Sequence, residues 1–433
     1  MDREPNRLSL VESAEAIRSG KITSERLVSA CLERIEAREG AIKAWASVDP
    51  ENALRQAYAC DRGQMSGPLR GVPVGIKDVL NTFDHPTQMG SPIYSGYQTR
   101  NDASCVALLR AAGAIILGKT ITCEFAGTFP NVTANPRALE RTPGGSSSGS
   151  AAAVADFMTP LAVGTQTGGS VLRPASFCGL VGFKPTYGTF NREGLKFAAE
   201  SIDTIGLIAR RVEDVSCVTS VLTGRQDYVA TPLNHPPRIA LCKTHLWPLA
   251  QSESRECLDH SVAKARAAGA TVVEIDLPAY FPELTAARGI INDVERARSL
   301  AWEWAHHREL LSEVLQKTMV SGFAIDDADY RSALALVAQA RVDIASILKP
   351  FDIILAPCVN GEAPVGLHYA GDPSFQALWT LLHLPSITIP AHRGPNGMPV
   401  GLQIVAAAGE DDKLLSAALW MQRSASVALE VLA

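Results

Sequence analysis

Short apolar runs alternate with amphipathic stretches along the first half of the chain. The run Val72–Ile76 predicts a strand that ends by presenting Lys77 and Asp78, and the run Ala114–Leu117 predicts another strand. Between them, Ala103–Ala112 has the periodicity of a helix. Such alternation of strands and helices is typical of an α/β protein, in which the strand tips carry the chemistry.

Two helices are predicted ahead of these strands. Ser9 and Glu12 form a capping-box pattern that opens the first helix, and Gly20 can end it. The second helix places five apolar residues on one face, namely Leu27, Val28, Cys31, Leu32 and Ile35. We expect both helices to cover a flank of the core.

Beyond Asp214 the hydrophobic pattern changes. Strands are predicted at Arg238–Cys242 and Thr271–Ile275, and a long, mostly helical region continues to Leu348. Strand character returns in three apolar runs: Asp352–Ala356, Ser386–Pro390 and Gly401–Val405. Because the sequence contains no internal repeat or flexible linker, we predict one domain over residues 1–433. We divide it into N-terminal helices (1–68), a catalytic core (69–213), a variable, mostly helical, substrate-shaping region (214–348) and a sheet-completing C-terminal segment (349–433).

The composition favours a soluble protein that acts on small molecules. Of the 433 residues, 46% are hydrophobic and 20% are charged, which suffices for a sizeable core. The net charge of -5 gives no electrostatic case for nucleic acid or an anionic membrane as partner, because proteins that bind those carry a basic patch. The charged N-terminal residues and the lack of long apolar runs predict a cytoplasmic protein.

The cysteines are scattered along the chain and never form a Cys-x-x-Cys pair. Their number, 9, is odd. This pattern favours reduced, mostly buried thiols over a disulfide framework or a zinc site. We therefore expect no metal.

One part of the chain contains two loops rich in glycine and serine, Gly144–Ser150 and Gly164–Ser170. They enclose a predicted alanine-rich helix, Ser150–Phe157, and a predicted buried strand, Leu161–Val163. Glycine lets backbone approach a ligand closely, and successive N–H groups in such a turn form an anion-binding concavity. A negative charge can develop there, so this part of the chain indicates an enzyme.

Three short patterns match known signatures but lack the required context. Residues 113–120 fit a phosphate loop, yet the middle four have the character of a buried strand. Residues 145–149 fit a nucleophile elbow, yet no strand precedes them. Ser261 and Lys264 fit a Ser-x-x-Lys pair, yet they lie within a predicted helix without companion motifs. We set all three aside.

What remains is serine and lysine chemistry without histidine. A serine hydroxyl is a weak nucleophile until a base takes its proton, and a lysine can be that base if burial lowers its pKa. Lys77 fits this role because it lies at a strand tip in an apolar segment. A surface lysine paired with Asp78 is the alternative, and this segment alone leaves both open.

Several motifs resemble those of the amidase signature family, and together they cover most of the chain. They are the lysine motif Gly71–Asp78, the serine–glycine loop Gly144–Ser150, the nucleophile loop Gly164–Ser170, and the later landmarks Ser201–Gly206 and Pro399–Gln403. The resemblance implies an α/β fold with a mixed, mostly central β-sheet covered by helices on both faces. It also implies an amidase that needs no cofactor.

The resemblance further implies a catalytic triad of Lys77, Ser146 and Ser170. In that family the middle serine follows a cis peptide bond, here Gly145–Ser146, and relays a proton between the lysine and the nucleophile. The two serines are 24 residues apart (170 - 146), as in the family. The oxyanion hole would be formed by the backbone N–H groups of Thr167, Gly168, Gly169 and Ser170.

Two residues depart from the commonest family pattern. Gln166 stands where aspartate is usual, and Arg173 lies three residues after the nucleophile instead of two. Both departures resemble the malonamidase branch, in which an arginine at this place binds a substrate carboxylate. We therefore expect a small amide such as malonamate as substrate, in contact with Arg173, Gln166 and Ser147. A structural Arg173, bonded to backbone carbonyls or to a buried acid, is the alternative.

The alternative function within this family is that of the glutamyl-tRNA(Gln) amidotransferase A protein, which hydrolyses glutamine. Such a chain would pass ammonia from glutamine to another site and would require a partner chain. The departures at Gln166 and Arg173 argue against this function. Members of the family often form homodimers, so a homodimer is the assembly that the resemblance suggests.

Overall fold

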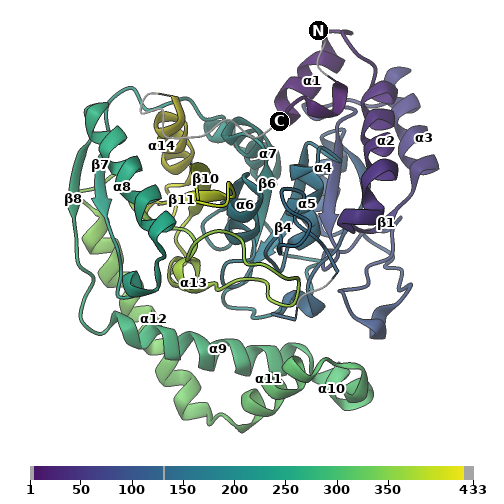
Figure 1. Ribbon diagram of the computed structural model, residues 1–433. Helices are drawn as coiled ribbons and strands as arrows, with labels where there is room; N and C mark the ends of the chain where they lie inside the picture. Colours follow the sequence, from purple (N-terminus) through teal and green to yellow (C-terminus); the bar gives the residue numbers. More distant parts are fainter. Residues whose placement is uncertain (1–3, 130–131, 424–433) are drawn as a thin grey trace.

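One mixed β-sheet runs through the computed structural model of the chain, which describes residues 4–129 and 132–423 (Figure 1). Its strands are β1 (Trp45–Val48), β2 (Pro73–Lys77), β3 (Ile115–Thr120), β4 (Leu161–Gln166), β5 (Val181–Lys184), β6 (Thr204–Ala209), β7 (Arg238–Leu241), β8 (Thr271–Glu274), β9 (Ile353–Pro357), β10 (Ser386–Arg393) and β11 (Pro399–Val405). Within the described residues they form an 11-stranded sheet in the order β1-β3-β2-β4-β6-β5-β10-β11-β9-β7-β8. The C-terminal strands β10 and β11 therefore lie inside the sheet, beside β5 and β9.

Helices cover both faces of this sheet. They are α1 (Leu10–Arg18), α2 (Ser24–Ile42), α3 (Pro50–Asp61), α4 (Ser104–Ala111), α5 (Ser148–Ala155), α6 (Leu172–Cys178), α7 (Val212–Thr223), α8 (Ser252–Ala267), α9 (Leu284–Ser299), α10 (Ala301–His307), α11 (Glu313–Ala324), α12 (Asp327–Leu348), α13 (Ser374–Leu381) and α14 (Asp411–Arg423). Alternate residues of β9 face opposite sides, as in any strand. Ile353 and Leu355 pack into the hydrophobic cluster that includes α8, and Ile354 packs into the cluster that includes α12. The predicted α/β fold with a mixed, helix-covered sheet is confirmed.

The strands predicted from apolar runs all form, with ends shifted by no more than three residues. The predicted capping box is also present, since Ser9 Oγ accepts from Glu12 N at 3.2 Å and Ser9 N donates to the Glu12 carboxylate at 2.8 Å. The hydrophobic pattern missed β1, β5 and β6. Strand β5 ends in Lys184, a buried lysine that donates to backbone carbonyl groups and interrupts the apolar pattern.

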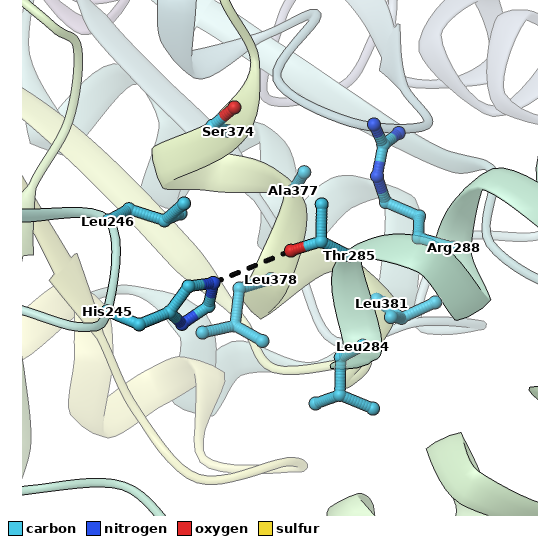
Figure 2. Close-up of a pocket in the computed structure, with 9 residues that line it drawn as sticks. All are labelled: His245, Leu246, Leu284, Thr285, Arg288, Ser374, Ala377, Leu378 and Leu381. Atoms are coloured by element: carbon cyan, nitrogen blue, oxygen red, sulfur yellow. Dashed lines mark hydrogen bonds between the residues drawn. The ribbon is translucent and has the colours of Figure 1, made fainter. Parts of the chain in front are cut away.

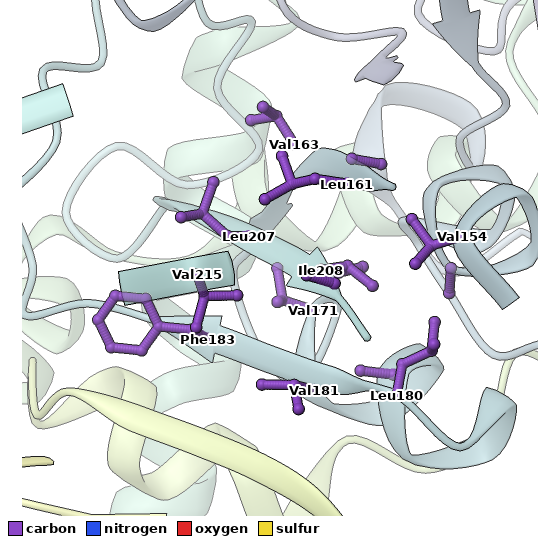
Figure 3. Packing of buried hydrophobic residues seen from close by; sticks show 14 of the residues in the cluster. Val154, Leu161, Val163, Val171, Leu180, Val181, Phe183, Leu207, Ile208 and Val215 are labelled. Carbon is purple, nitrogen blue, oxygen red and sulfur yellow. The ribbon is translucent and has the colours of Figure 1, made fainter. Parts of the chain in front are cut away.

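The middle of the sheet is packed on side chains from several elements (Figure 3). Leu161 and Val163 of β4, Phe183 of β5 and Leu207 of β6 are completely buried there. Strands β4 and β6 pair antiparallel along their whole length, from Leu161 opposite Ala209 to Gln166 opposite Thr204. This pairing gives the C-terminal end of β4 a rigid support.

Strands β2 and β4 are parallel neighbours, with Val74 opposite Leu161 and Ile76 opposite Val163. The C-terminal ends of parallel strands meet at one edge of a sheet. Lys77, the last residue of β2, and the loop after Gln166, the last residue of β4, are therefore brought together at that edge.

Helices α9, α10 and α11 lie together at one end of the molecule, at the bottom of Figure 1, and α12 leads back to the sheet. Helix α9 packs against both α11 and α12. Among the described residues, no helix combines the length and the apolar character needed to cross a bilayer.

Candidate active site

Lys77 is completely buried at the end of β2. Its Nζ donates to Ser146 Oγ and to Thr165 Oγ1, both at 2.8 Å, and lies 3.4 Å from Thr165 O. Burial lowers the pKa of Lys77 to about 7, while the nearby Asp203 raises this pKa and Arg173 lowers it. A lysine with such a pKa is partly neutral at pH 7, which a general base requires.

The surface pairing of Lys77 with Asp78, one of the two alternatives, is wrong. Asp78 is itself buried and pairs with Lys119 of β3, whose Nζ lies 3.1 Å from Asp78 Oδ1. Successive residues of an extended chain point to opposite sides, so Lys77 and Asp78 face different surroundings. Lys119 belongs to the apparent phosphate loop, and residues Ile115–Thr120 are a buried strand as predicted.

The peptide bond Gly145–Ser146 is cis, as the resemblance predicted. Ser146 accepts the hydrogen bond from Lys77, and its carbonyl accepts one from Cys123 N at 3.1 Å. A Cβ atom on residue 145 would lie 2.9 Å from Cys123 Sγ, so the close approach of these segments requires Gly145. The serine loop is thereby held against Lys77.

Ser147 ties this loop to the next one. Its hydroxyl donates to Thr165 O and accepts from Thr165 N, each at 3.3 Å, and its N–H donates to Ser170 O at 3.3 Å. A Cβ atom on Gly164 would lie 2.8 Å from Ser147 Oγ, so the glycine lets the serine loop pack directly on β4. Contact between Ser147 and a substrate stays a prediction.

Ser170 lies in the turn between β4 and α6. It keeps 7% of its surface exposed, whereas Ser146 keeps 1%. In the part of the chain that the structure describes, no hydrogen bond joins the hydroxyl groups of these two serines, so the proton transfer from Ser170 to Ser146 stays a prediction.

The turn before α6 offers free backbone donors. Within residues 4–129 and 132–423, the N–H groups of residues 167–170 donate no hydrogen bond, whereas the next two, of Val171 and Leu172, donate to Gln166 Oε1 at 2.8 and 3.0 Å. Unpaired N–H groups beside a nucleophile are what a developing oxyanion needs. Their role as an oxyanion hole stays a prediction.

Gln166 uses both ends of its side-chain amide within the protein. Besides accepting from the backbone, it donates through Nε2 to Thr380 Oγ1 at 3.0 Å, and that hydroxyl donates to Gly168 O at 2.8 Å. An aspartate at position 166 has no donor for Thr380. Gln166 therefore positions the nucleophile turn, and its contact with substrate stays a prediction.

Two residues of this network were not expected from the sequence. Thr165 binds Lys77, and Asp203 accepts hydrogen bonds from the Thr167 hydroxyl and from the N–H groups of Ala198 and Ala199. Asp203 lies in the landmark Ser201–Gly206, so that motif was a signal for it. Nothing in the local pattern marks Thr165.

Arg173 is buried and only partly bonded. Its Nη2 donates to Gly145 O at 2.5 Å, whereas its Nε and Nη1 are buried without a hydrogen-bond partner among the described residues. Burial lowers the pKa of Arg173 to about 10. The bond to a backbone carbonyl agrees with the structural alternative, yet two donors of the guanidinium are left for a ligand.

A pocket opens between α9 and α13 (Figure 2). Thr285 and Arg288 of α9 line it, together with Ser374 of α13 and His245. His245 Nε2 and Thr285 Oγ1 lie 3.5 Å apart. Among the residues described, no group of three or more His, Cys, Asp or Glu side chains could hold a metal ion.

Comparison with known proteins identifies the family of this chain. The family model described as "Amidase" matches residues 26–415. The glutamyl-tRNA(Gln) amidotransferase A protein of Roseiflexus sp. (strain RS-1) is 33% identical, over 95% of this chain and 95% of that protein. Its namesake from Oleidesulfovibrio alaskensis is 35% identical, over 95% of this chain and 96% of that protein. A crystal structure of an amidase is 30% identical, covers 96% of this chain and 99% of its own, and superposes with a TM-score of 0.88.

These relatives correct one expectation. Both of these amidotransferase relatives bear the name of the alternative function and not that of a malonamidase. The departures at Gln166 and Arg173 therefore do not separate this chain from that group. The assignment to the malonamidase branch is not supported.

Proposed function

Because the chain belongs to the amidase family, we propose that it hydrolyses the C–N bond of a small, carboxylate-bearing amide through an acyl-enzyme on Ser170. The observation that carries the proposal is the completely buried Lys77, hydrogen-bonded to Ser146 at 2.8 Å. Lys77 forms no ion pair within the part of the chain that the structure describes, and burial lowers its pKa to about 7, which gives it the basicity that catalysis at neutral pH requires.

The acylation step uses the three side chains in series. Neutral Lys77 accepts the proton of the Ser146 hydroxyl, Ser146 accepts the proton of Ser170, and Ser170 Oγ attacks the amide carbon. The carbonyl oxygen becomes an oxyanion that accepts hydrogen bonds from the N–H groups of residues 167–170, and each such donor contributes about 3–4 kcal/mol to the transition state. When the C–N bond breaks, the proton on Lys77 returns through Ser146 to the leaving nitrogen.

Deacylation repeats the same proton path with water as the nucleophile. Water attacks the ester carbon, its proton passes through Ser146 to Lys77, and the C–O bond to Ser170 breaks. Ser170 recovers its proton, and the carboxylic acid leaves. The reaction consumes one amide and one water and releases one carboxylic acid and one amine or ammonia, and it uses no cofactor.

The unsatisfied donors of Arg173 support a substrate with a carboxylate. A carboxylate close to the scissile carbonyl can accept from Nε and Nη1, which have no other partner in the described residues. Malonamate is the simplest such amide. We further propose that the region 214–348 shapes the substrate site, since Arg288 of α9 lies against Gly168 in the nucleophile turn.

A second candidate function is glutamine hydrolysis within an amidotransferase. The observation in its favour is the match to relatives of that name over 95% of this chain. Glutamine also carries a carboxylate, so Arg173 does not decide between the two. This function would require a partner chain to receive ammonia, whereas the first needs none and is compatible with a homodimer.

The test is a hydrolysis screen of the purified chain alone, with malonamate, glutamine and neutral small amides as substrates. Turnover of malonamate without a partner supports the first function. Turnover of glutamine alone, raised by a copurifying chain, supports the second.

The nucleophile is tested separately with Ser170→Ala. This variant should lose essentially all turnover and keep its melting temperature, and a slowly released substrate should add its acyl mass only to the wild type. Substantial hydrolysis by folded Ser170→Ala would refute the mechanism.

A further inference from the structure

Arg288 stands in the helical region of the chain, at a position that no sequence motif marks. It lies on α9, and Figure 2 shows it extending from that helix without a dashed hydrogen bond to any of the other labelled side chains. Thr285, one turn earlier on the same helix, is bonded to His245. Arg288 is thus the cationic part of this pocket wall.

The guanidinium of Arg288 reaches the nucleophile turn. A Cβ atom built on Gly168 would lie 3.5 Å from Arg288 Nη1. Gly168 precedes Ser170 by two residues, and consecutive Cα atoms are about 3.8 Å apart, so Gly168 and Ser170 are close neighbours. A substrate only a few bonds long, held at Ser170, can therefore extend to Arg288.

Arg288 has no fixed counter-ion in the described part of the chain. No hydrogen bond or ion pair there involves its guanidinium. Two acids, Asp372 and Asp293, favour the charged form of Arg288, and neither forms an ion pair with it among the described residues. Asp372 is already occupied, because Oδ1 accepts from the N–H and hydroxyl of Ser374 and Oδ2 lies 3.4 Å from Asn360 Nδ2.

Arg173 lies on the other side of the same short segment. A Cβ atom on Gly371 would lie 2.9 Å from Arg173 Cδ, while Pro373 Cβ lies 3.2 Å from the Cβ position of Gly168, next to Arg288. Only residues 371–373 separate the two contacts. Consistent with this proximity, the charge of Arg288 adds to burial in lowering the pKa of Arg173.

Two guanidinium groups, those of Arg173 and Arg288, meet at this corner, and neither forms an ion pair within the described residues. Asp372 and Asp293 both favour the charged form of Arg288. The oxygens of Asp293 already accept hydrogen bonds from Asn292 and Ser321. Arg173 is buried and Arg288 is half-buried, so the repulsion between their like charges is only partly screened by water. An anion between them relieves this repulsion and accepts from the unpartnered donors of Arg173. A carboxylate on the ligand would supply such an anion.

We infer that Arg288 is a specificity-determining residue that, together with Arg173, binds the ionised carboxylate of a monoanionic amide. The inference rests on the proposed function and names the substrate class of the same site. It assigns this role to a side chain of α9, which reaches the nucleophile turn from outside the motif-bearing loops.

The test compares two substrates of the same size, malonamate, which carries one negative charge, and malonamide, which is neutral. Arg288→Gln is expected to lower kcat/KM for malonamate about 10- to 100-fold, mainly through KM, because a hydrogen bond to a charged group is lost. The variant should leave kcat/KM for malonamide unchanged. Arg298→Gln is the matched control, since Arg298 lies on the same helix, is exposed and faces Asp327 at 3.8 Å. Equal losses on both substrates, or no loss on malonamate, would overturn the inference.

Two further measurements separate this inference from the proposed function. If Arg288→Gln does not fold, Arg288→Met gives the same comparison, and unchanged selectivity for malonamate over malonamide would overturn the inference. Binding of malonamate to Ser170→Ala, measured by calorimetry, needs no turnover. If the wild type hydrolyses no amide, the proposed function fails, and weaker malonamate binding after Arg288→Gln in this background still supports the subsite. Equal binding rejects it.

Discussion

Replacing Lys77 by methionine removes a buried amine while keeping a side chain of similar length. Lys77 is completely buried, and its pKa is lowered from 10.5 to about 7, mainly by burial. The folded protein therefore disfavours the ammonium form, which the unfolded chain keeps up to high pH. Lys77→Met should therefore remove the free-energy cost of burying a group that is charged in the unfolded chain.

The sign and size follow from the two pKa values. Between pH 7 and pH 10.5 the unfolded chain binds more protons at residue 77 than the folded chain, so the free energy of unfolding rises with pH. At pH 7 the lysine costs about 4 kcal/mol relative to an uncharged residue, and by pH 9 about 2 kcal/mol. The hydrogen bonds to Ser146 and Thr165 that methionine loses offset about 2 kcal/mol of the gain.

The assay is urea unfolding of wild type and Lys77→Met at pH 7, 8 and 9. The variant should be more stable at pH 7, by about 1–3 kcal/mol, and its advantage should shrink by roughly 2 kcal/mol by pH 9. Lys317→Met is the control for the substitution itself, because Lys317 is exposed on α11. A stability difference that is independent of pH, or that grows with pH, would refute the reasoning.

The titration of Lys77 should also appear in the pH profile of the wild type, where kcat/KM should rise tenfold per pH unit up to about pH 7 and level off above it. A flat profile between pH 5 and 9 would exclude Lys77 as the base. Activity should be insensitive to EDTA. Arg173→Ala should cost about 10- to 150-fold in kcat/KM for malonamate and spare malonamide, whereas equal losses, or a fall in melting temperature that explains them, would leave Arg173 a structural role. Lys119→Met, in contrast to Lys77→Met, should lower the free energy of unfolding by about 3–5 kcal/mol because it leaves the buried Asp78 without its cationic partner, and an unchanged urea midpoint would contradict this expectation.

The local pattern was sufficient for elements whose signal lies within a few residues. The apolar run before Lys77 predicted a strand and placed the lysine at its tip, because burial on both faces of a central strand selects apolar residues one after another. The glycines and serines of the two loops marked a site of close backbone approach, and Gly145 and Gly164 are where the structure needs it. The capping box at Ser9 was equally local.

Partner choice was decided only by the tertiary structure. From the sequence alone, Lys77 could be either a buried base or a surface lysine. In the structure, β2 pairs parallel with β4, and the Nζ of Lys77 contacts Ser146 and Thr165, which lie 69 and 88 residues further along the chain. Asp78 follows Lys77 directly, yet it pairs with Lys119.

The position of Arg288 beside the nucleophile turn was likewise not predictable from the sequence. It belongs to a helix without any motif and more than 100 residues from the nucleophile turn, yet it lies against Gly168. Periodicity records which side of an element is buried, because each residue responds to its own exposure to water. Which charges and hydrogen-bonding groups meet depends on strand order and on the packing of distant segments, and these come into being only when the chain has folded.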